Sequence, residues 1–98
     1  MNSELSQSLT TKEIDTYHRD GVLLLKNIFD KEWIELLNKG LDLNYKSPTE
    51  RSRIWDRDDL GHKMFYDTLA WREIEEYKKF IFNSPAAQIC GQLMKSKT

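Results

Sequence analysis

The feature that most constrains the fold of this chain is a run of four apolar residues, Val22, Leu23, Leu24 and Leu25, directly after Gly21. A short continuous apolar run is typical of a β-strand covered on both faces. A buried helix segment would also have this composition, but the length of the run favours a strand. A strand needs neighbouring strands for its backbone N–H and C=O groups, and helices cannot supply those hydrogen bonds.

The rest of the sequence offers little that could pair with this strand. Residues 51–55 are compatible with a short edge strand in which Ile54 and Trp55 are the apolar members, and residues 56–61 read as a charged turn. A sheet of two strands is marginally stable in water. We therefore expect the sheet to be completed by strands encoded elsewhere, and the chain to be the first part of a larger domain.

The segment before the apolar run carries a complete helix-start signal. Thr10 at the N-cap with Glu13 three residues later forms a capping box, and Leu9 and Ile14 occupy the two positions of a hydrophobic staple. Gly21 suits the left-handed position that ends many helices. The pattern predicts a helix that begins after Thr10 and ends before Gly21.

A second helix is predicted to begin after Asp30, a favourable N-cap residue that follows Phe29. Its buried face is expected to consist of the apolar residues at helical spacing: Trp33, Ile34, Leu37 and Leu41. Glycine weakens a helix interior by about 1 kcal/mol relative to alanine. We therefore place the end of this helix between Gly40 and Asn44, followed by a loop over residues 44–50.

From His62 onward the pattern becomes helical again. The apolar residues that recur every three or four positions are Phe65, Leu69, Trp71, Ile74, Tyr77 (or the alternative Lys78) and Ile81. Ser84 followed by Pro85 is a specific start signal for a last helix. That helix is expected to pack one side, made of Ala86, Ile89, Cys90, Leu93 and Met94.

These elements together predict the fold class. We expect a mainly α chain with one or two short strands (α+β), in which a disordered N-terminus over residues 1–8 precedes a folded segment over residues 9–98. A chain of 98 residues is at most one small domain.

The composition excludes several classes of protein. With 15 Lys and Arg against 16 Asp and Glu, the net charge is −1 and the signs are mixed, so no nucleic acid partner is expected. No stretch approaches the roughly 20 apolar residues that span a bilayer, so no membrane is expected. Cys90 is the single cysteine, which fits a reducing compartment. We expect a cytoplasmic protein in which Cys90 is a buried structural thiol.

The tripeptide His18, Arg19, Asp20 has the H-x-D pattern of a non-haem iron site, in which two histidines and one carboxylate share one face of the metal. Such a site needs an extended backbone, whereas these residues lie at the predicted helix end. Residues two apart on a helix point about 200° away from each other. His62 is the only other histidine. We therefore interpret His18 and Asp20 as helix-end residues.

The other candidates have ordinary structural interpretations. Glu73, Glu75, Glu76, Lys78 and Lys79 are expected to form a solvated helix face with an i, i+4 pair between Glu75 and Lys79. Trp33 and Trp71 are expected in the core. Trp55, which lies among charged residues, is a weak candidate for lining the mouth of a substrate site. The residues themselves predict no catalytic, cofactor-binding or metal-binding side chain.

The order of the motifs resembles the N-terminal region of the phytanoyl-CoA dioxygenase-like family. The resemblance runs over nearly the whole chain and rests on YHRDGVLLLK at 17–26, FDKEWIELL at 29–37, FIFNSPAA at 80–87 and the Leu93-Met94 pair. In that family a helix, a strand after the Asp-Gly pair and a second helix after an acidic cap lead into a catalytic barrel.

The resemblance implies an Fe(II)- and 2-oxoglutarate-dependent oxygenase with a double-stranded β-helix (jelly-roll, cupin-like) core that hydroxylates a small organic substrate. The family's H-x-D, its distal histidine and its 2-oxoglutarate-binding arginine map beyond this sequence. The chain is therefore expected to be inactive alone, with the missing C-terminal catalytic barrel as its partner. The alternative is a stand-alone helical protein-interaction module.

Overall fold

The computed structural model describes residues 1–56 and 63–96, which are mainly helical with one two-stranded antiparallel sheet. The elements, in chain order, are α1 (Thr11–Asp20), α2 (Lys31–Lys46), β1 (Ser52–Asp56), β2 (Lys63–Asp67), the 3-10 helix η1 (Ala70–Arg72), α3 (Glu75–Asn83) and α4 (Ala86–Leu93). This content confirms the α+β class at the level of its helices and its short sheet.

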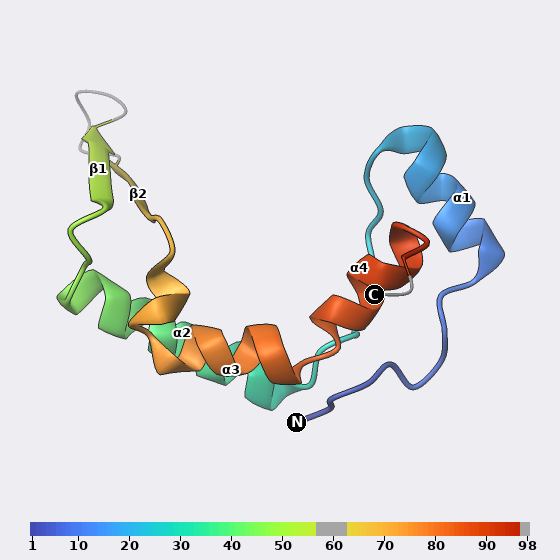
Figure 1. Ribbon diagram of the computed structural model, residues 1–98, viewed down its shortest axis with the longest axis horizontal. Coiled ribbons are helices and arrows are strands. Elements are labelled where there is room, and N and C mark those ends of the chain that lie inside the picture. Colours follow the sequence, from blue (N-terminus) through green and yellow to red (C-terminus); the bar gives the residue numbers. More distant parts are fainter. Residues whose placement is uncertain (57–62, 97–98) are drawn as a thin grey trace.

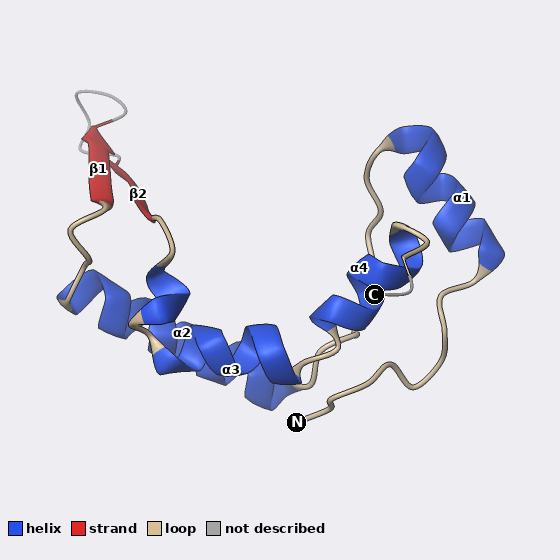
Figure 2. Ribbon diagram, in the orientation of Figure 1, coloured by secondary structure: helices blue, strands red, loops and turns tan. Residues whose placement is uncertain are grey.

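The elements form an open U rather than a closed globule (Figure 1). Helices α2 and α3 lie side by side as its base, the two strands rise at one end, and α4 and α1 rise at the other (Figure 2). The Cα radius of gyration is 16.3 Å, against about 13 Å for a compact domain of roughly 100 residues. Much apolar surface consequently stays exposed.

Helix α1 begins and ends where the sequence predicts. The Thr10 hydroxyl accepts a hydrogen bond from the Glu13 N–H (3.1 Å), and the Glu13 carboxylate accepts one from the Thr10 N–H (2.8 Å), so the capping box is complete. Gly21 has a φ of 74° and donates its N–H to the Tyr17 carbonyl (2.8 Å). Both boundary predictions are confirmed.

The strand predicted at residues 22–25 is not formed, and this prediction is wrong for the described part of the chain. The segment between Gly21 and Lys26 has no strand partner there, and its backbone makes no hydrogen bond to another described residue. The side chains still alternate as in a strand. Val22 and Leu24 are 70% and 77% exposed, whereas Leu23 and Leu25 are half-buried. The two strands that do pair lie at the far end of the U.

Helix α2 extends past both positions at which it was predicted to end. Gly40 lies inside the helix and is buried, because α3 passes directly over it. A Cβ atom at Gly40 would lie 3.0 Å from Cβ of Glu76 and 3.0 Å from the ring of Tyr77. The glycine therefore serves a close helix–helix approach and does not end the helix.

The buried face of α2 also differs from the prediction. Its buried residues are Trp33, Gly40 and Asn44, whereas Ile34 and Leu41 are exposed. The Trp33 side chain is 2% exposed, packs edge-on against Phe80 of α3 with 5.8 Å between ring centroids, and donates its Nε1–H to the Asn2 carbonyl (2.6 Å). Trp33 is thus the centre of the small core.

The edge strand expected at residues 51–55 is confirmed as β1 with a shift of one residue. The helix predicted from His62 is wrong over residues 63–67, which form β2 with Ile54 opposite Phe65, but the later part of the same pattern does form a helix, α3. The four-residue spacing of Phe65 and Leu69 imitates a helix, but Phe65 packs on Tyr45 of α2, with ring centroids 4.6 Å apart. Most of the expected charged turn lies outside the described residues.

Helix α4 starts one residue later than the Ser84-Pro85 signal predicts, with Pro85 at the N-cap and Ala86 as its first residue. Ser84 and Pro85 are buried, and the Ser84 hydroxyl accepts a hydrogen bond from the Ala86 N–H (3.2 Å). The predicted packed side is only partly correct, because Cys90 and Met94 are exposed. The interpretation of Cys90 as a buried thiol is therefore wrong.

Candidate functional site

The H-x-D tripeptide does not form a metal site in this fold. All three residues belong to α1, and the carboxylate of Asp20 pairs with the guanidinium of Arg19 (2.8 and 3.0 Å). This hydrogen bond lowers the pKa of Asp20 and raises that of Arg19. His18 instead directs its Nε2 to the Leu93 carbonyl at 2.9 Å, so this nitrogen carries the proton.

The side-chain atoms of the tripeptide that could ligate a metal therefore do not fit an iron centre, because His18 and Asp20 are directed to different partners. His62, the other histidine, lies outside the described residues. Within residues 1–56 and 63–96, no three or more His, Cys, Asp or Glu side chains come together as a metal site would require. His18 in fact ties the end of α1 to the end of α4.

The most developed candidate site is an apolar groove between residues 22–29 and α4. Its lining residues are Leu23, Leu24, Leu25, Ile28, Phe29, Ala86, Ile89, Cys90 and Leu93, and its volume is about 330 Å³. We call this the α4 groove. Its wall is almost entirely apolar apart from the Cys90 thiol, so it offers contact area and no group for acid–base chemistry.

The unpaired segment at residues 22–25 forms one wall of the α4 groove. Leu23, Leu24 and Leu25 all line the groove; Leu23 and Leu25 are half-buried, whereas Val22 and Leu24 stay mostly exposed. An extended segment with free backbone donors and acceptors is a template for pairing with another strand. The arrangement can therefore bind an extended apolar segment through main-chain hydrogen bonds and side-chain contact together.

Trp55, the residue predicted to line a substrate mouth, lies opposite Met64 in the register of β1 and β2. Its side chain is outside the described part of the structure. The exposed apolar residues around it are Ile54, Met64 and Tyr66. These side chains lie on both faces of the strand pair. Exposed apolar side chains on both faces are unusual for a strand pair that contacts only water.

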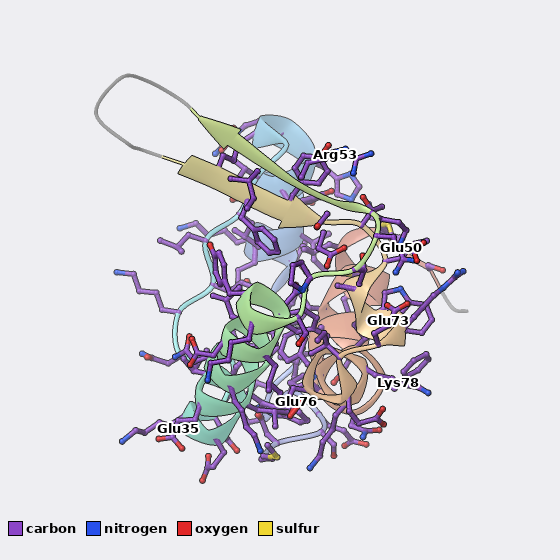
Figure 3. All side chains as sticks on the ribbon, turned by 90° about the vertical axis from the view of Figure 1, so that its left-hand side faces the viewer. Glu35, Glu50, Arg53, Glu73, Glu76 and Lys78 are labelled. Carbon is purple, nitrogen blue, oxygen red and sulfur yellow. The ribbon has the colours of Figure 1, made fainter. Side chains whose placement is uncertain are left out.

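The charged stretch at residues 73–79 is only partly the solvated face that the sequence predicts. Glu76 lies between α2 and α3, whereas Lys78 points away from the helix pair (Figure 3). Glu76 pairs with Lys39 of α2 (3.9 Å), and Glu73 accepts two hydrogen bonds from Arg51 (2.9 and 3.0 Å). No ion pair between Glu75 and Lys79 is present among the described residues.

A polar cluster that the sequence did not reveal joins β2 to α2. The Asp67 carboxylate accepts hydrogen bonds from the Asn44 side-chain amide (2.8 Å), the Thr49 N–H (2.8 Å) and the Thr49 hydroxyl. The Tyr77 hydroxyl donates to the other end of the Asn44 amide (3.4 Å). Asn44 is buried, and no buried side-chain polar atom of the described residues lacks a partner.

The electrostatics of this cluster indicate structure rather than catalysis. Burial raises the pKa of Asp67, but the hydrogen bonds from Thr49 and Asn44 and the charge of Arg51 outweigh it, so the pKa lies below its usual range. A general base works best with a pKa near the operating pH. Asp67 is therefore a hydrogen-bond anchor. Burial, with Asp67 nearby, raises the pKa of Tyr77.

One sequence signal could have located the cluster. Trp33, Leu37, Gly40 and Asn44 follow the alternating four- and three-residue spacing of a helix stripe that packs on a second helix. Extending the buried stripe of α2 along that spacing leads to Gly40 and then to Asn44. Asp67 and Thr49 give no comparable local signal, because they meet Asn44 only through the path of the loop and β2.

Comparison with family models, curated proteins and solved structures finds no match to this chain.

None of the helices in the described residues is both long enough and apolar enough to cross a membrane.

Proposed function

We propose that this chain is the N-terminal helical portion of a phytanoyl-CoA dioxygenase-like, Fe(II)- and 2-oxoglutarate-dependent oxygenase of the cytoplasm. Its role is to support a jelly-roll catalytic barrel that acts on a small organic substrate. The observation that carries the proposal is the extended segment at residues 22–25, which has apolar side chains on both faces and no strand beside it.

The surroundings of this segment support a place in a sheet. Leu23 and Leu25 are half-buried beside α4, as side chains of a sheet are beside a covering helix, while Val22 and Leu24 are mostly exposed and could be covered by a second layer. A sheet that has helices on one face and a core on the other is a common layered architecture. Neighbouring strands would satisfy the free backbone groups and bury the exposed row at the same time.

The open U supports the same proposal. Its two ends carry apolar side chains that no other described element covers, including Leu24 at one end and Ile54 and Met64 at the other. A body seated against these surfaces would remove them from water, and burial of apolar area stabilises by about 25 cal/mol per Å². A barrel encoded by further sequence is such a body.

The chemistry of the proposed enzyme resides outside this chain. His18 and Asp20 point to different partners, so their side chains do not fit a shared Fe(II) site. The α4 groove has no charged or polar side chain that would hold the two carboxylates of 2-oxoglutarate. In the proposed enzyme, the iron and the co-substrate are bound by the barrel. These 98 residues contribute the helices that buttress it.

The coding sequence after Thr98 tests the proposal directly. An open frame that continues into strands, an H-x-D, a distal histidine and an arginine supports it. The extended protein should then consume 2-oxoglutarate with Fe(II), and replacement of the downstream H-x-D histidine by alanine should abolish that activity. A stop codon after Thr98, with a cooperatively unfolding 98-residue product, overturns it.

The second outcome would favour a stand-alone interaction module that binds through the α4 groove and the free strand edge. Leu24→Lys provides a matched probe for both cases, because Leu24 is 77% exposed and its replacement leaves the helices intact. In the extended enzyme this change should lower the midpoint of thermal unfolding. In a stand-alone module it should leave the folding of the chain unchanged.

A further inference from the structure

The strand pair β1 and β2 extends away from the helices as a separate arm (Figure 1). Among the described residues, Phe65 at the middle of β2 packs on Tyr45 of α2, and Asp67 at the inner end of β2 binds Asn44 and Thr49. The side chains of Ile54, Met64 and Tyr66 are exposed, and Met64 lies further out on the arm than these contacts. The described contacts that hold the strand pair therefore lie between the middle of β2 and its inner end.

Arg51 closes the base of this arm. It precedes β1, and its Nε donates to the carbonyl of Thr68, which follows β2, at 2.7 Å. The same guanidinium donates two hydrogen bonds to Glu73, which lies between η1 and α3. One side chain thus joins both ends of the strand pair to the helical part of the chain.

The residue after Thr68 has a strained backbone. Leu69 has a φ of 59° and a ψ of 24°, the left-handed conformation that disfavours a leucine. Its side chain is 41% exposed, so burial does little to offset the strain. Strain of this kind persists only where surrounding contacts hold it. Here the Leu69 carbonyl accepts a hydrogen bond from the Arg72 N–H of η1 (3.1 Å), and Arg51 donates to the neighbouring Thr68 carbonyl (2.7 Å).

We propose that β1 and β2 form a movable arm that pivots at Leu69 and is latched by Arg51. While Arg51 holds Thr68 and Glu73, Leu69 stays left-handed and the arm keeps the described position. When the latch opens, Asp67 and Phe65 lose their contacts with Asn44, Thr49 and Tyr45, and Leu69 relaxes to a right-handed or extended backbone. The strand pair then swings as a unit with its exposed apolar side chains.

The movement is large enough to measure. A strand of 5 residues spans about 17 Å, so a rotation of about 30° at its base displaces the far end by about 9 Å. Met64 lies near that far end and is exposed, and Asn38 is exposed on α2. Spin labels at Met64→Cys and Asn38→Cys, in a chain with Cys90→Ser, report the position of the arm by electron–electron distance measurement.

The latch is tested by three variants in the 98-residue chain. Arg51→Ala should add a displaced, broader population of distances. It should also lower the hydrogen-exchange protection of the Thr49 amide about tenfold, because the displaced arm takes the Asp67 carboxylate away from this N–H, and tenfold is about the factor for one hydrogen bond to a charged group. Leu69→Asn, which tolerates a left-handed backbone, should narrow the distribution. Arg53→Ala is the matched control, because the hydrogen bonds that the guanidinium of Arg53 makes to described residues go to the nearby carbonyls of Glu50 and Ser52.

The outcomes separate clearly. Unchanged distances in Arg51→Ala would overturn the proposal. Loss of the cross-strand amide protection of β1 and β2 in that variant would also overturn it, because the strand pair would then unfold rather than swing. If Arg51→Ala does not fold, Leu69→Asn decides. A narrower distribution supports the pivot, and an unchanged or broader one refutes it.

Discussion

Replacement of Gly40 by alanine tests the packing of α2 on α3, which forms the base of the molecule. An ordinary helical glycine gains about 1 kcal/mol of stability on this change, because alanine has the higher helix propensity. At Gly40 the added Cβ would lie 3.0 Å from Cβ of Glu76 and 3.0 Å from the Tyr77 ring. Neither atom is the end of a long flexible side chain, so α3 has to move.

The two effects have opposite signs, and their magnitudes decide the outcome. Overpacking of this kind costs about 1–3 kcal/mol, which exceeds the gain of about 1 kcal/mol from propensity. We expect Gly40→Ala to lower the free energy of unfolding by about 1 kcal/mol. In a domain of this size, such a loss corresponds to a fall of about 4–8 °C in Tm.

Gly91 in α4 provides the matched control. A Cβ at Gly91 would meet only the Ser96 carbonyl oxygen, at the ordinary contact distance of 3.5 Å. Gly91→Ala should therefore gain about 0.5–1 kcal/mol from propensity alone. Both variants are compared by urea unfolding followed by circular dichroism. If Gly40→Ala stabilises the chain as much as Gly91→Ala, the close approach of α2 and α3 is wrong.

Three further predictions concern the core, the cap and the polar cluster. Trp33→Phe should destabilise the chain by about 1–3 kcal/mol in urea unfolding, because it loses the hydrogen bond to Asn2 and leaves a partial cavity; an unchanged midpoint would contradict the buried core. Thr10→Ala should lower stability by about 1 kcal/mol by the same measurement, since it removes the capping bond to Glu13; an equal loss in a variant of Thr11 would show that the cap is not responsible. The folded pKa of Asp67 lies below its unfolded value, so its contribution is complete above the unfolded pKa and declines as the pH falls from there through the folded pKa. The acid-induced loss of stability should shrink in Asp67→Asn, and an identical pH profile would refute the role of the carboxylate.

Local chemistry explains which boundaries the sequence predicts correctly. The start of α1 after Thr10 and its end at Gly21 are confirmed, and α4 starts within one residue of the position that Ser84 and Pro85 predict. Each depends on residues within four positions of one another. Such interactions form whatever the rest of the chain does, so they can be read without the tertiary structure.

The predictions that fail depend on partners distant in the sequence. Gly40 was predicted to end α2, but it lies inside the helix because the Tyr77 ring packs close to it. Phe65 was predicted to be helical, but it pairs with Ile54 in a β-sheet. The spacing of apolar residues indicates which side chains are buried, but it does not indicate which element buries them. For the same reason, the sequence did not predict the cluster around Asp67.

The sequence by itself therefore determined that α1, α2 and α4 form helices, the caps of α1 and the apolar character of residues 22–25. Only the tertiary structure decided that this segment has no strand beside it among the described residues, and that the partner of His18 is the Leu93 carbonyl. The physical reason is that caps and propensities act within a few residues, whereas strand pairing and side-chain convergence require segments that only the folded chain brings together.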